Sequence, residues 1–138
     1  MHTFYTTTEN SRWMIVDDDQ QILVLLAAVI KKITGAEVEC HNSPAAALAA
    51  FAAMPGKYEL IITDFDMPGM DGVELCRRVH AIAPGQEIFL ATGSGIFTED
   101  AACQAGFGAL LNKPFPASAL RAAVAGAGLE TQPMSLAA

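Results

Sequence analysis

Short apolar runs and helix-forming stretches alternate along the chain, and this alternation restricts the fold more than any other feature of the sequence. Five apolar runs of strand length occupy residues 13–16, 38–40, 60–62, 88–91 and 107–111. Stretches rich in Ala and Leu follow them at 20–34, 43–53, 70–81, 98–105 and 117–125. The pattern predicts an α/β fold in which five helices connect the strands of a parallel sheet. Glu37 and Glu39 alternate with apolar residues in the second run, which predicts an edge strand.

Length and composition indicate a single folded unit. The chain has 138 residues, of which 52% are hydrophobic and 17% charged, and these values suit one globular domain. We expect this domain at 11–126, a disordered N-terminal segment at 1–10 and an unpacked C-terminal tail at 127–138. The net charge of −7 argues against direct contact with nucleic acid, because binding to the phosphate backbone needs a basic surface.

The cysteines and the longest apolar run bear on location. Cys40, Cys76 and Cys103 are odd in number and form no C-x-x-C pair, which predicts reduced, buried thiols in a cytoplasmic protein. The apolar run at 22–30 is too short to cross a bilayer, so no membrane partner is expected.

Polar residues follow four of the apolar runs, where the strands of a parallel sheet would end. They are Asp17, Asp18 and Asp19 after the first run, Thr63, Asp64 and Asp66 after the third, Thr92 after the fourth, and Asn112, Lys113 and Pro114 after the fifth. Ligands of such sheets bind in the crevice outside the carboxyl ends of the strands. We therefore expect these residues to meet at one site.

The residue types in this group suit a phosphoryl group held beside a metal ion. Carboxylates that lie close together repel one another, and a hard divalent cation such as Mg²⁺ relieves the repulsion. A hydroxyl at Thr92 and an ammonium at Lys113 offer hydrogen bonds to the oxygens of an anion. An Asp at such a site can itself accept the phosphoryl group. Taken singly, residues 17–19 fit an acidic helix start and 64–66 a turn, so only their joint occurrence favours the site.

Residues 61–72, with the sequence IITDFDMPGMDG, resemble the phosphoacceptor loop of the receiver domain of two-component response regulators. The pair Asp17–Asp18, Thr92 and the segment 113–115 match as well, and the resemblance covers 11–125. It implies a doubly wound, flavodoxin-like sheet with strand order 2-1-3-4-5 and five helices. It also implies a signalling domain rather than an enzyme, with slow self-dephosphorylation only.

The resemblance assigns roles to the acidic residues. Asp64 is expected to accept the phosphoryl group from a phosphohistidine on a histidine kinase or a histidine phosphotransfer protein. Mg²⁺ is expected at the carboxylates of Asp18 and Asp64 and the backbone carbonyl of Asp66, with Asp17 acting through a water. Lys113 is expected to pair with Asp64 or with its phosphate.

The resemblance also predicts how the signal leaves the site. Thr92 is expected to move toward the phosphoryl group and to transmit its presence to the fourth helix, and Lys113–Pro114 is expected to be a cis peptide. The fourth helix, fifth strand and fifth helix would form the surface for a downstream protein target. On this surface Ile96 and Phe97 are either exposed anchors or part of the core. Leu110 departs from the family, which often has an aromatic switch residue at this position.

Several alternatives remain open at this point. A phosphatase of the haloacid dehalogenase type shares the Asp-x-Asp pattern of residues 64–66, although its pair normally follows the first strand and here it follows the third run. A degenerate receiver that only acts as a scaffold is a further alternative. Residues 93–95 form a plain loop or a mobile gate. The chain is either a single-domain regulator or a receiver excised from a longer protein.

Overall fold

The computed structural model describes residues 12–93 and 95–129. The strands are β1 (Arg12–Val16), β2 (Glu37–His41), β3 (Leu60–Asp64), β4 (Ile88–Gly93) and β5 (Ala109–Lys113). The helices are α2 (Gln20–Thr34), α3 (Pro44–Ala53), α4 (Gly72–Ile82), α5 (Glu99–Gln104) and α6 (Ala117–Gly126), with a 3-10 turn η1 (Pro55–Lys57). The strands are parallel in the order β2-β1-β3-β4-β5. Both the predicted fold class and the edge position of β2 are confirmed.

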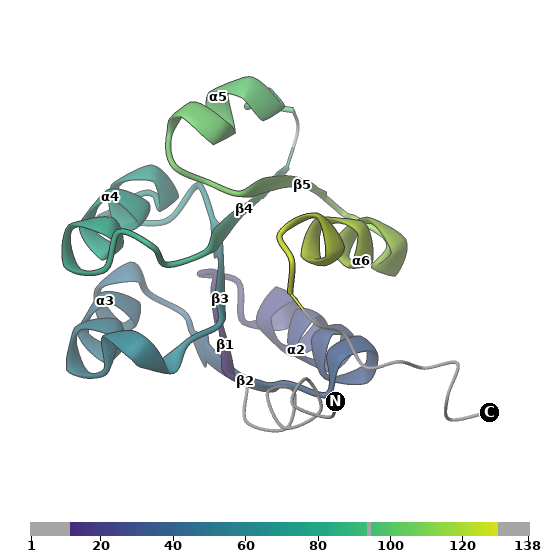
Figure 1. The fold of residues 1–138 in the computed structure, drawn as a ribbon, viewed down its shortest axis with the longest axis horizontal. Helices are drawn as coiled ribbons and strands as arrows, with labels where there is room; N and C mark the ends of the chain where they lie inside the picture. Colours follow the sequence, from purple (N-terminus) through teal and green to yellow (C-terminus); the bar gives the residue numbers. More distant parts are fainter. Residues whose placement is uncertain (1–11, 94, 130–138) are drawn as a thin grey trace.

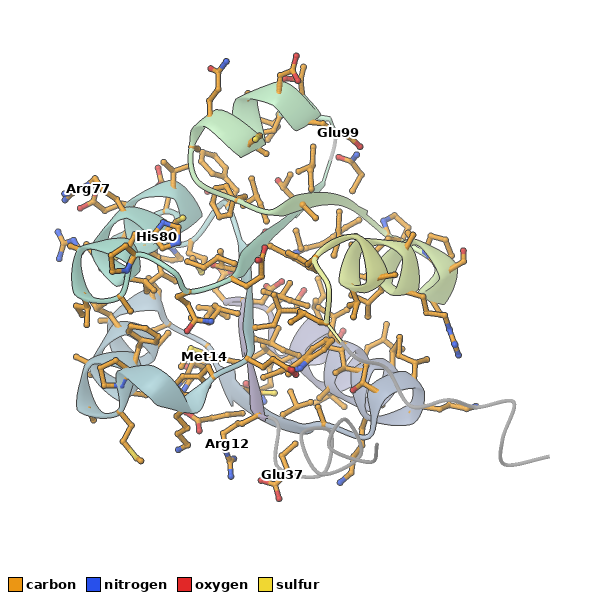
Figure 2. All side chains as sticks on the ribbon, viewed as in Figure 1. Arg12, Met14, Glu37, Arg77, His80 and Glu99 are labelled. Atoms are coloured by element: carbon orange, nitrogen blue, oxygen red, sulfur yellow. The ribbon has the colours of Figure 1, made fainter. Side chains whose placement is uncertain are left out.

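Helices cover both faces of the sheet and create two hydrophobic cores (Figure 1). Trp13 and Ile15 belong to the core shared with α2 and α6, whereas Met14 and Val16 belong to the core shared with α3, α4 and α5. Successive side chains of a strand point to opposite faces, so a sheet buried on both faces needs unbroken apolar strands. Figure 2 shows Met14 in the interior, while charged side chains such as Arg77 lie at the periphery.

Side-chain caps define where the helices begin. The Asp19 carboxylate accepts hydrogen bonds from the backbone N–H groups of Gln21 and Ile22, at 2.9 and 3.3 Å, and caps α2. Ser43 and Thr98 cap α3 and α5 in the same way. These caps satisfy backbone donors that have no partner within the helix. The start of α2 therefore lies directly after the acidic residues that follow β1.

The fifth strand starts and ends two residues later than the apolar run predicts. Phe107 is buried, but its backbone N–H donates to Ala102 at the end of α5, so it completes the helix rather than the sheet. Strand pairing begins at Ala109, opposite Phe89 of β4. An apolar run marks burial, and burial does not require strand pairing. The later register carries β5 to Lys113, which belongs to the strand itself.

The prediction of three buried thiols is wrong for two of them. Cys76 lies inside the core, and burial raises the pKa of its thiol to about 11. Cys40 and Cys103 are exposed, because one lies on the edge strand β2 and the other on an outer face of α5. Across residues 12–93 and 95–129, none of the helices combines the length and the apolar character that crossing a membrane requires.

The C-terminal boundary of the packed chain lies beyond the predicted position. Ala127 and Leu129 pack against the core between the sheet and helices α2 and α6, and the Leu129 N–H donates to the Val124 carbonyl at 3.0 Å. The expectation of an unpacked tail is therefore wrong for residues 127–129. The remaining tail, 130–138, and the N-terminal segment lie outside the described residues.

A charged cluster on the edge strand makes stability depend on acid pH. Partial burial opposes ionisation of Glu39, but hydrogen bonds from His41, Tyr58 and Lys57 outweigh it and lower its pKa from 4.5 to about 2. The Tyr58 hydroxyl donates to this carboxylate at 2.7 Å, and the Lys57 ammonium lies at 3.3 Å. A carboxylate with a lowered pKa stabilises the fold above pH 4.5, and this contribution is lost as the pH falls toward 2.

Glu39→Gln should therefore reduce the loss of stability on acidification. The variant has no carboxylate to protonate at this position, so its melting temperature should fall less than that of the wild type between pH 6 and about pH 3. Glu37→Gln, on the same strand but exposed, is the matched control and should keep the wild-type loss. Thermal denaturation over the pH series measures the difference. Equal losses in wild type and Glu39→Gln would contradict this role.

Candidate functional site

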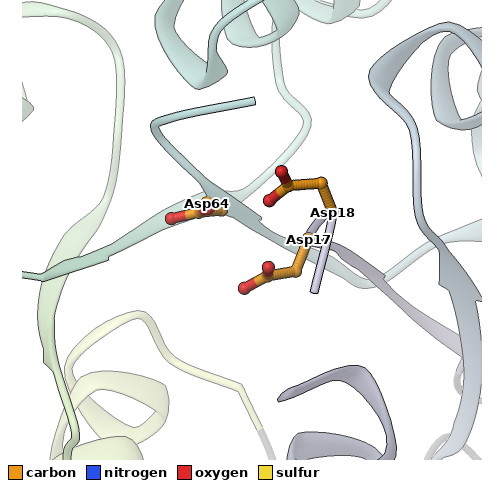
Figure 3. Close-up of side chains that lie close together, drawn as sticks. All are labelled: Asp17, Asp18 and Asp64. Atoms are coloured by element: carbon orange, nitrogen blue, oxygen red, sulfur yellow. The ribbon is translucent and has the colours of Figure 1, made fainter. Parts of the chain in front are cut away.

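Three carboxylates gather at the carboxyl ends of β1 and β3. Asp17 and Asp18 follow β1 directly, and Asp64 is the last residue of β3, the strand that pairs with β1. Each contributes a carboxylate oxygen to a group in which all the oxygens lie within 4.8 Å of one another (Figure 3). Asp17 is buried, Asp64 is mostly buried, and Asp18 is exposed. The predicted convergence at one edge of the sheet is thus confirmed for these three residues.

The ammonium group of Lys113 reaches the group of three carboxylates from β5, the edge strand opposite β2. This ammonium lies 2.6 Å from Oδ2 of Asp17 and 3.1 Å from Oδ1 of Asp64. It comes from the end of β5, and β4 separates that strand from β3. The resemblance implied that Lys113 pairs with Asp64 or its phosphate; the structure has that contact, but the shorter one is with Asp17. Both oxygens of Asp17 are engaged, since its Oδ1 accepts the Asp19 backbone N–H at 2.9 Å.

The charges at the site do not balance. Burial raises the pKa of Asp64; Lys113 acts in the opposite direction, and the negative charge of Asp17 raises it further. Burial alone would lower the pKa of Lys113, but its contacts with Asp17 and Asp64 outweigh that effect and raise it. Three carboxylates therefore face one ammonium. A divalent cation with oxygen ligands fits this donor set, because it would compensate the remaining negative charge.

Thr92 lies beside the acidic group on the neighbouring strand. Asp64 pairs with Ala91 of β4, and Thr92 is the next residue along that strand. Its side chain is buried, and among the residues that the structure describes its hydroxyl has a single, long hydrogen bond of 3.5 Å to the Gly93 carbonyl oxygen. A hydroxyl held by so weak a hydrogen bond can turn toward a stronger acceptor.

The start of α4 holds the backbone of Asp64 in place. The Gly72 N–H donates to the Phe65 carbonyl at 2.8 Å, and a Cβ at Gly72 would lie 2.3 Å from the Asp64 carbonyl oxygen. The Thr63 hydroxyl donates to the same oxygen at 2.9 Å. This close approach was not predicted from the sequence, in which the available signal is a Gly in the first turn of the predicted helix 70–81.

The remaining predicted site residues have different outcomes. Lys113–Pro114 is a cis peptide, as the resemblance implies. The Asp66 side chain is exposed and does not belong to the acidic group, in agreement with a role for its carbonyl alone. A metal contact of that carbonyl stays a prediction. Of residues 93–95, Ser94 lies outside the described residues, so the choice between a plain loop and a mobile gate stays open.

Comparison with known proteins identifies the family that this fold and site define. The model of the response regulator receiver domain matches residues 13–125, so the chain belongs to this family. The protein is thus a receiver domain of two-component response regulators, as predicted. Neither a phosphatase of the haloacid dehalogenase type nor a degenerate scaffold is favoured.

Relatives and solved structures agree with this assignment. The transcriptional regulatory protein FixJ of Azorhizobium caulinodans is 34% identical over 98 residues, which cover 70% of this chain and 46% of FixJ. The crystal structure of FixJ-N is 31% identical, with a TM-score of 0.72 over 85% of this chain and 92% of that one. A receiver domain protein from Clostridium thermocellum has 26% identity and a TM-score of 0.78 over 85% of this chain and 93% of that one. The chain spans less than half the length of its sequence relatives.

Proposed function

We propose that Asp64 accepts a phosphoryl group from a phosphohistidine of a histidine kinase or a histidine phosphotransfer protein. The main support is the position of Asp64, whose carboxylate lies 3.1 Å from the Lys113 ammonium and beside Asp17 and Asp18. Asp17 is the other carboxylate near Lys113, but it is more buried and both its oxygens have partners. Asp64 is therefore the carboxylate of this group that combines partial exposure with a cation beside it.

In the proposed transfer, an oxygen of Asp64 forms a bond to phosphorus while the bond between phosphorus and the imidazole nitrogen breaks. The electron pair of the broken bond stays on the imidazole, and Asp64 becomes an acyl phosphate. Lys113 supplies positive charge to the phosphoryl oxygens, and the loosely held Thr92 hydroxyl turns to donate to one of them. The new hydrogen bond at Thr92 is the first change that can pass from the site to α5.

Mg²⁺ fits the donor set, and we assign it to the carboxylates of Asp18 and Asp64 and the carbonyl of Asp66, with Asp17 acting through a water. When bound, Mg²⁺ neutralises charge on the phosphoryl group during its transfer. The closeness of three carboxylates supports the assignment, because it is costly without a compensating cation.

The proposal includes the partners and the setting of the domain. One sequence relative, named probable histidine kinase 4 of Oryza sativa, is 39% identical over 69 residues, which supports a place in histidine-to-aspartate signalling. We assign the output to a protein target that contacts α5, β5 and α6, with no direct contact to nucleic acid or membrane. The unpaired cysteines fit a reducing compartment, so the cytoplasm is the proposed location. Residues 11–126 would form the receiver unit, extended by the packed residues 127–129.

Labelling with a small phosphodonor tests the proposed function directly. The wild type, incubated with acetyl phosphate, should gain one phosphoryl group by intact mass in the presence of Mg²⁺ and little in chelator. It should not turn over small phosphomonoesters. Turnover of such esters would instead support a phosphatase, and the absence of any label with Mg²⁺ would contradict phosphoacceptor function.

Asp18→Asn should make the metal-free protein more stable and reduce the effect of Mg²⁺. The substitution removes one of the repelling charges and one metal ligand together. For the wild type, Mg²⁺ at ten times its dissociation constant should add about 1.4 kcal/mol, or roughly 3–6 °C in melting temperature. Melting curves in chelator and in a Mg²⁺ series measure both effects.

Asp19→Asn is the matched control for this metal experiment. It removes the same charge one residue away, and Asn caps a helix as well as Asp does, so α2 keeps its start. The Mg²⁺ increment of this variant should equal that of the wild type. Indifference of the wild type to millimolar Mg²⁺, or a lower melting temperature of Asp18→Asn in chelator, would contradict the metal site.

A further inference from the structure

Two aromatic rings connect the loop that follows Asp64 with the start of α5. The ring centroids of Phe65 and Phe97 lie 4.9 Å apart with the ring planes at 72°, an edge-to-face contact. Phe65 is bonded directly to Asp64, and Phe97 directly precedes Thr98, the N-cap of α5. The contact therefore joins the residue after the proposed phosphoacceptor to the residue before a helix that is far away in the sequence.

Phe65 cannot move independently of the site. Its carbonyl is held by the Gly72 N–H at 2.8 Å, and its Cα lies 3.1 Å from where a Cβ of Gly72 would be. Its ring packs against the core beneath α3, α4 and α5. A displacement of the Asp64 backbone therefore also displaces the Phe65 ring.

Phe97 is the point at which the β4–α5 loop attaches to this core. Its ring is partly buried and packs on the same core, whereas the preceding Ile96 is 58% exposed. This resolves the choice left by the sequence: Phe97 belongs to the core and Ile96 does not. The helix that follows is short, and Ala102 is its buried residue, so α5 has little anchorage of its own. The Phe97 ring therefore adds a contact with the core directly before the N-cap of α5.

The second connection to the output surface is aliphatic in this chain. Leu110 of β5 is partly buried and packs against the same core, with no ring that could rotate between two positions. The Phe65–Phe97 pair instead provides an aromatic contact between the site and the output side. Edge-to-face pairs are directional, so a small displacement of one ring changes the interaction with the other.

We propose that the Phe65–Phe97 contact couples the phosphorylation state of Asp64 to the position of α5. The inference rests on the proposed function of Asp64. A phosphoryl group adds bulk and negative charge next to Phe65 and attracts the Thr92 hydroxyl near the end of β4, just before the β4–α5 loop. Both changes alter the distance or angle between the two rings, and α5, weakly anchored elsewhere, follows Phe97.

Hydrogen exchange of the α5 amides, residues 99–104, tests the coupling with Mg²⁺ and the phosphoryl mimic beryllofluoride. In the wild type, the mimic should change the exchange rates of these amides. Phe97→Leu keeps an apolar side chain but removes the ring, so its Asp64 should still be labelled by acetyl phosphate. Its α5 response to beryllofluoride should fall by at least half. Ile96→Ala, at the exposed neighbouring position, is the control and should respond as the wild type does.

Thermodynamic reciprocity gives a second measurement, whose result would not change if Phe97 had a purely structural role. If the free energy of the ring contact differs between the two states of Asp64, loss of the contact must change the apparent affinity for beryllofluoride by the factor that corresponds to that difference. The strength of an aromatic pair sets the expected change at roughly two- to tenfold. An α5 response and a beryllofluoride affinity in Phe97→Leu equal to those of the wild type would overturn the inference.

A double-mutant cycle separates failure of this inference from failure of the proposed function. Phe65→Leu, Phe97→Leu and the double variant are compared by α5 exchange without any phosphoryl group. Non-additive effects show that the two rings act together on α5, and additive effects overturn the ring link. Absence of labelling in the wild type would contradict the proposed function. Even then, the double-mutant cycle decides whether the two rings connect the acidic site to α5, because it needs no phosphoryl group.

Discussion

Asp64→Asn should abolish formation of the acyl phosphate and leave the fold intact. An amide offers no anionic oxygen to attack phosphorus, and the similar size of Asn preserves the packing of this mostly buried side chain. Labelling by acetyl phosphate should fall to background, while the circular dichroism spectrum stays that of the wild type. The melting temperature in chelator should not fall, because burial, together with the charge of Asp17, outweighs the attraction of Lys113 and raises the pKa of Asp64, so the negative charge itself is unfavourable in the folded protein. Persistent labelling of this variant would contradict the assignment of Asp64.

Asp66→Asn is the matched control and also separates the two function classes. The Asp66 side chain is exposed and lies outside the acidic group, and its proposed role uses the backbone carbonyl, which the substitution retains. The variant should therefore be labelled as the wild type is. In a phosphatase with an Asp-x-Asp pair, the second Asp acts as the acid, so loss of a phosphoryl-transfer activity in this variant would favour that class.

Gly72→Ala should disturb both stability and phosphorylation. The added methyl group would lie 2.3 Å from the Asp64 carbonyl oxygen, which is backbone and cannot rotate away. Relief of this overlap requires α4 and the end of β3 to separate, at a cost of about 1–3 kcal/mol. The displaced Asp64 should then react more slowly, by roughly tenfold or more, since small misplacements of a nucleophile cost large factors in rate. Melting temperature and the rate of labelling by acetyl phosphate measure the two effects.

Gly56→Ala provides the comparison for this substitution. A Cβ at Gly56 has no heavy atom within 4 Å, so the same change in the 3-10 turn η1 should alter stability little and labelling not at all. A Gly72→Ala variant that melts and reacts like Gly56→Ala would show that the close approach of α4 does not position Asp64.

Much of the fold and of the candidate site could be predicted from local sequence. Apolar runs separated by helix-forming stretches define a parallel sheet, and in such a sheet every strand ends at the same edge. Residues at or just after the ends of the runs, such as Asp17, Asp18 and Asp64, are therefore brought together without knowledge of any contact. Alternating Glu residues in the second run likewise identified the edge strand, because a central strand would have to bury them.

Tertiary structure alone decided which partners these residues have. Lys113 and Asp17 are 96 positions apart in sequence, and their 2.6 Å contact depends on how β5 lies relative to β1 across the whole sheet. The burial of Phe97 on Phe65, the exposure of Ile96 and the later start of β5 depend in the same way on packing between distant segments. Local sequence determines which residues favour strand, helix or cap, because those preferences act over a few residues. Choices between neighbours of similar chemistry, such as Asp17 or Asp64 beside Lys113, are made by the packing of elements that are distant in the chain.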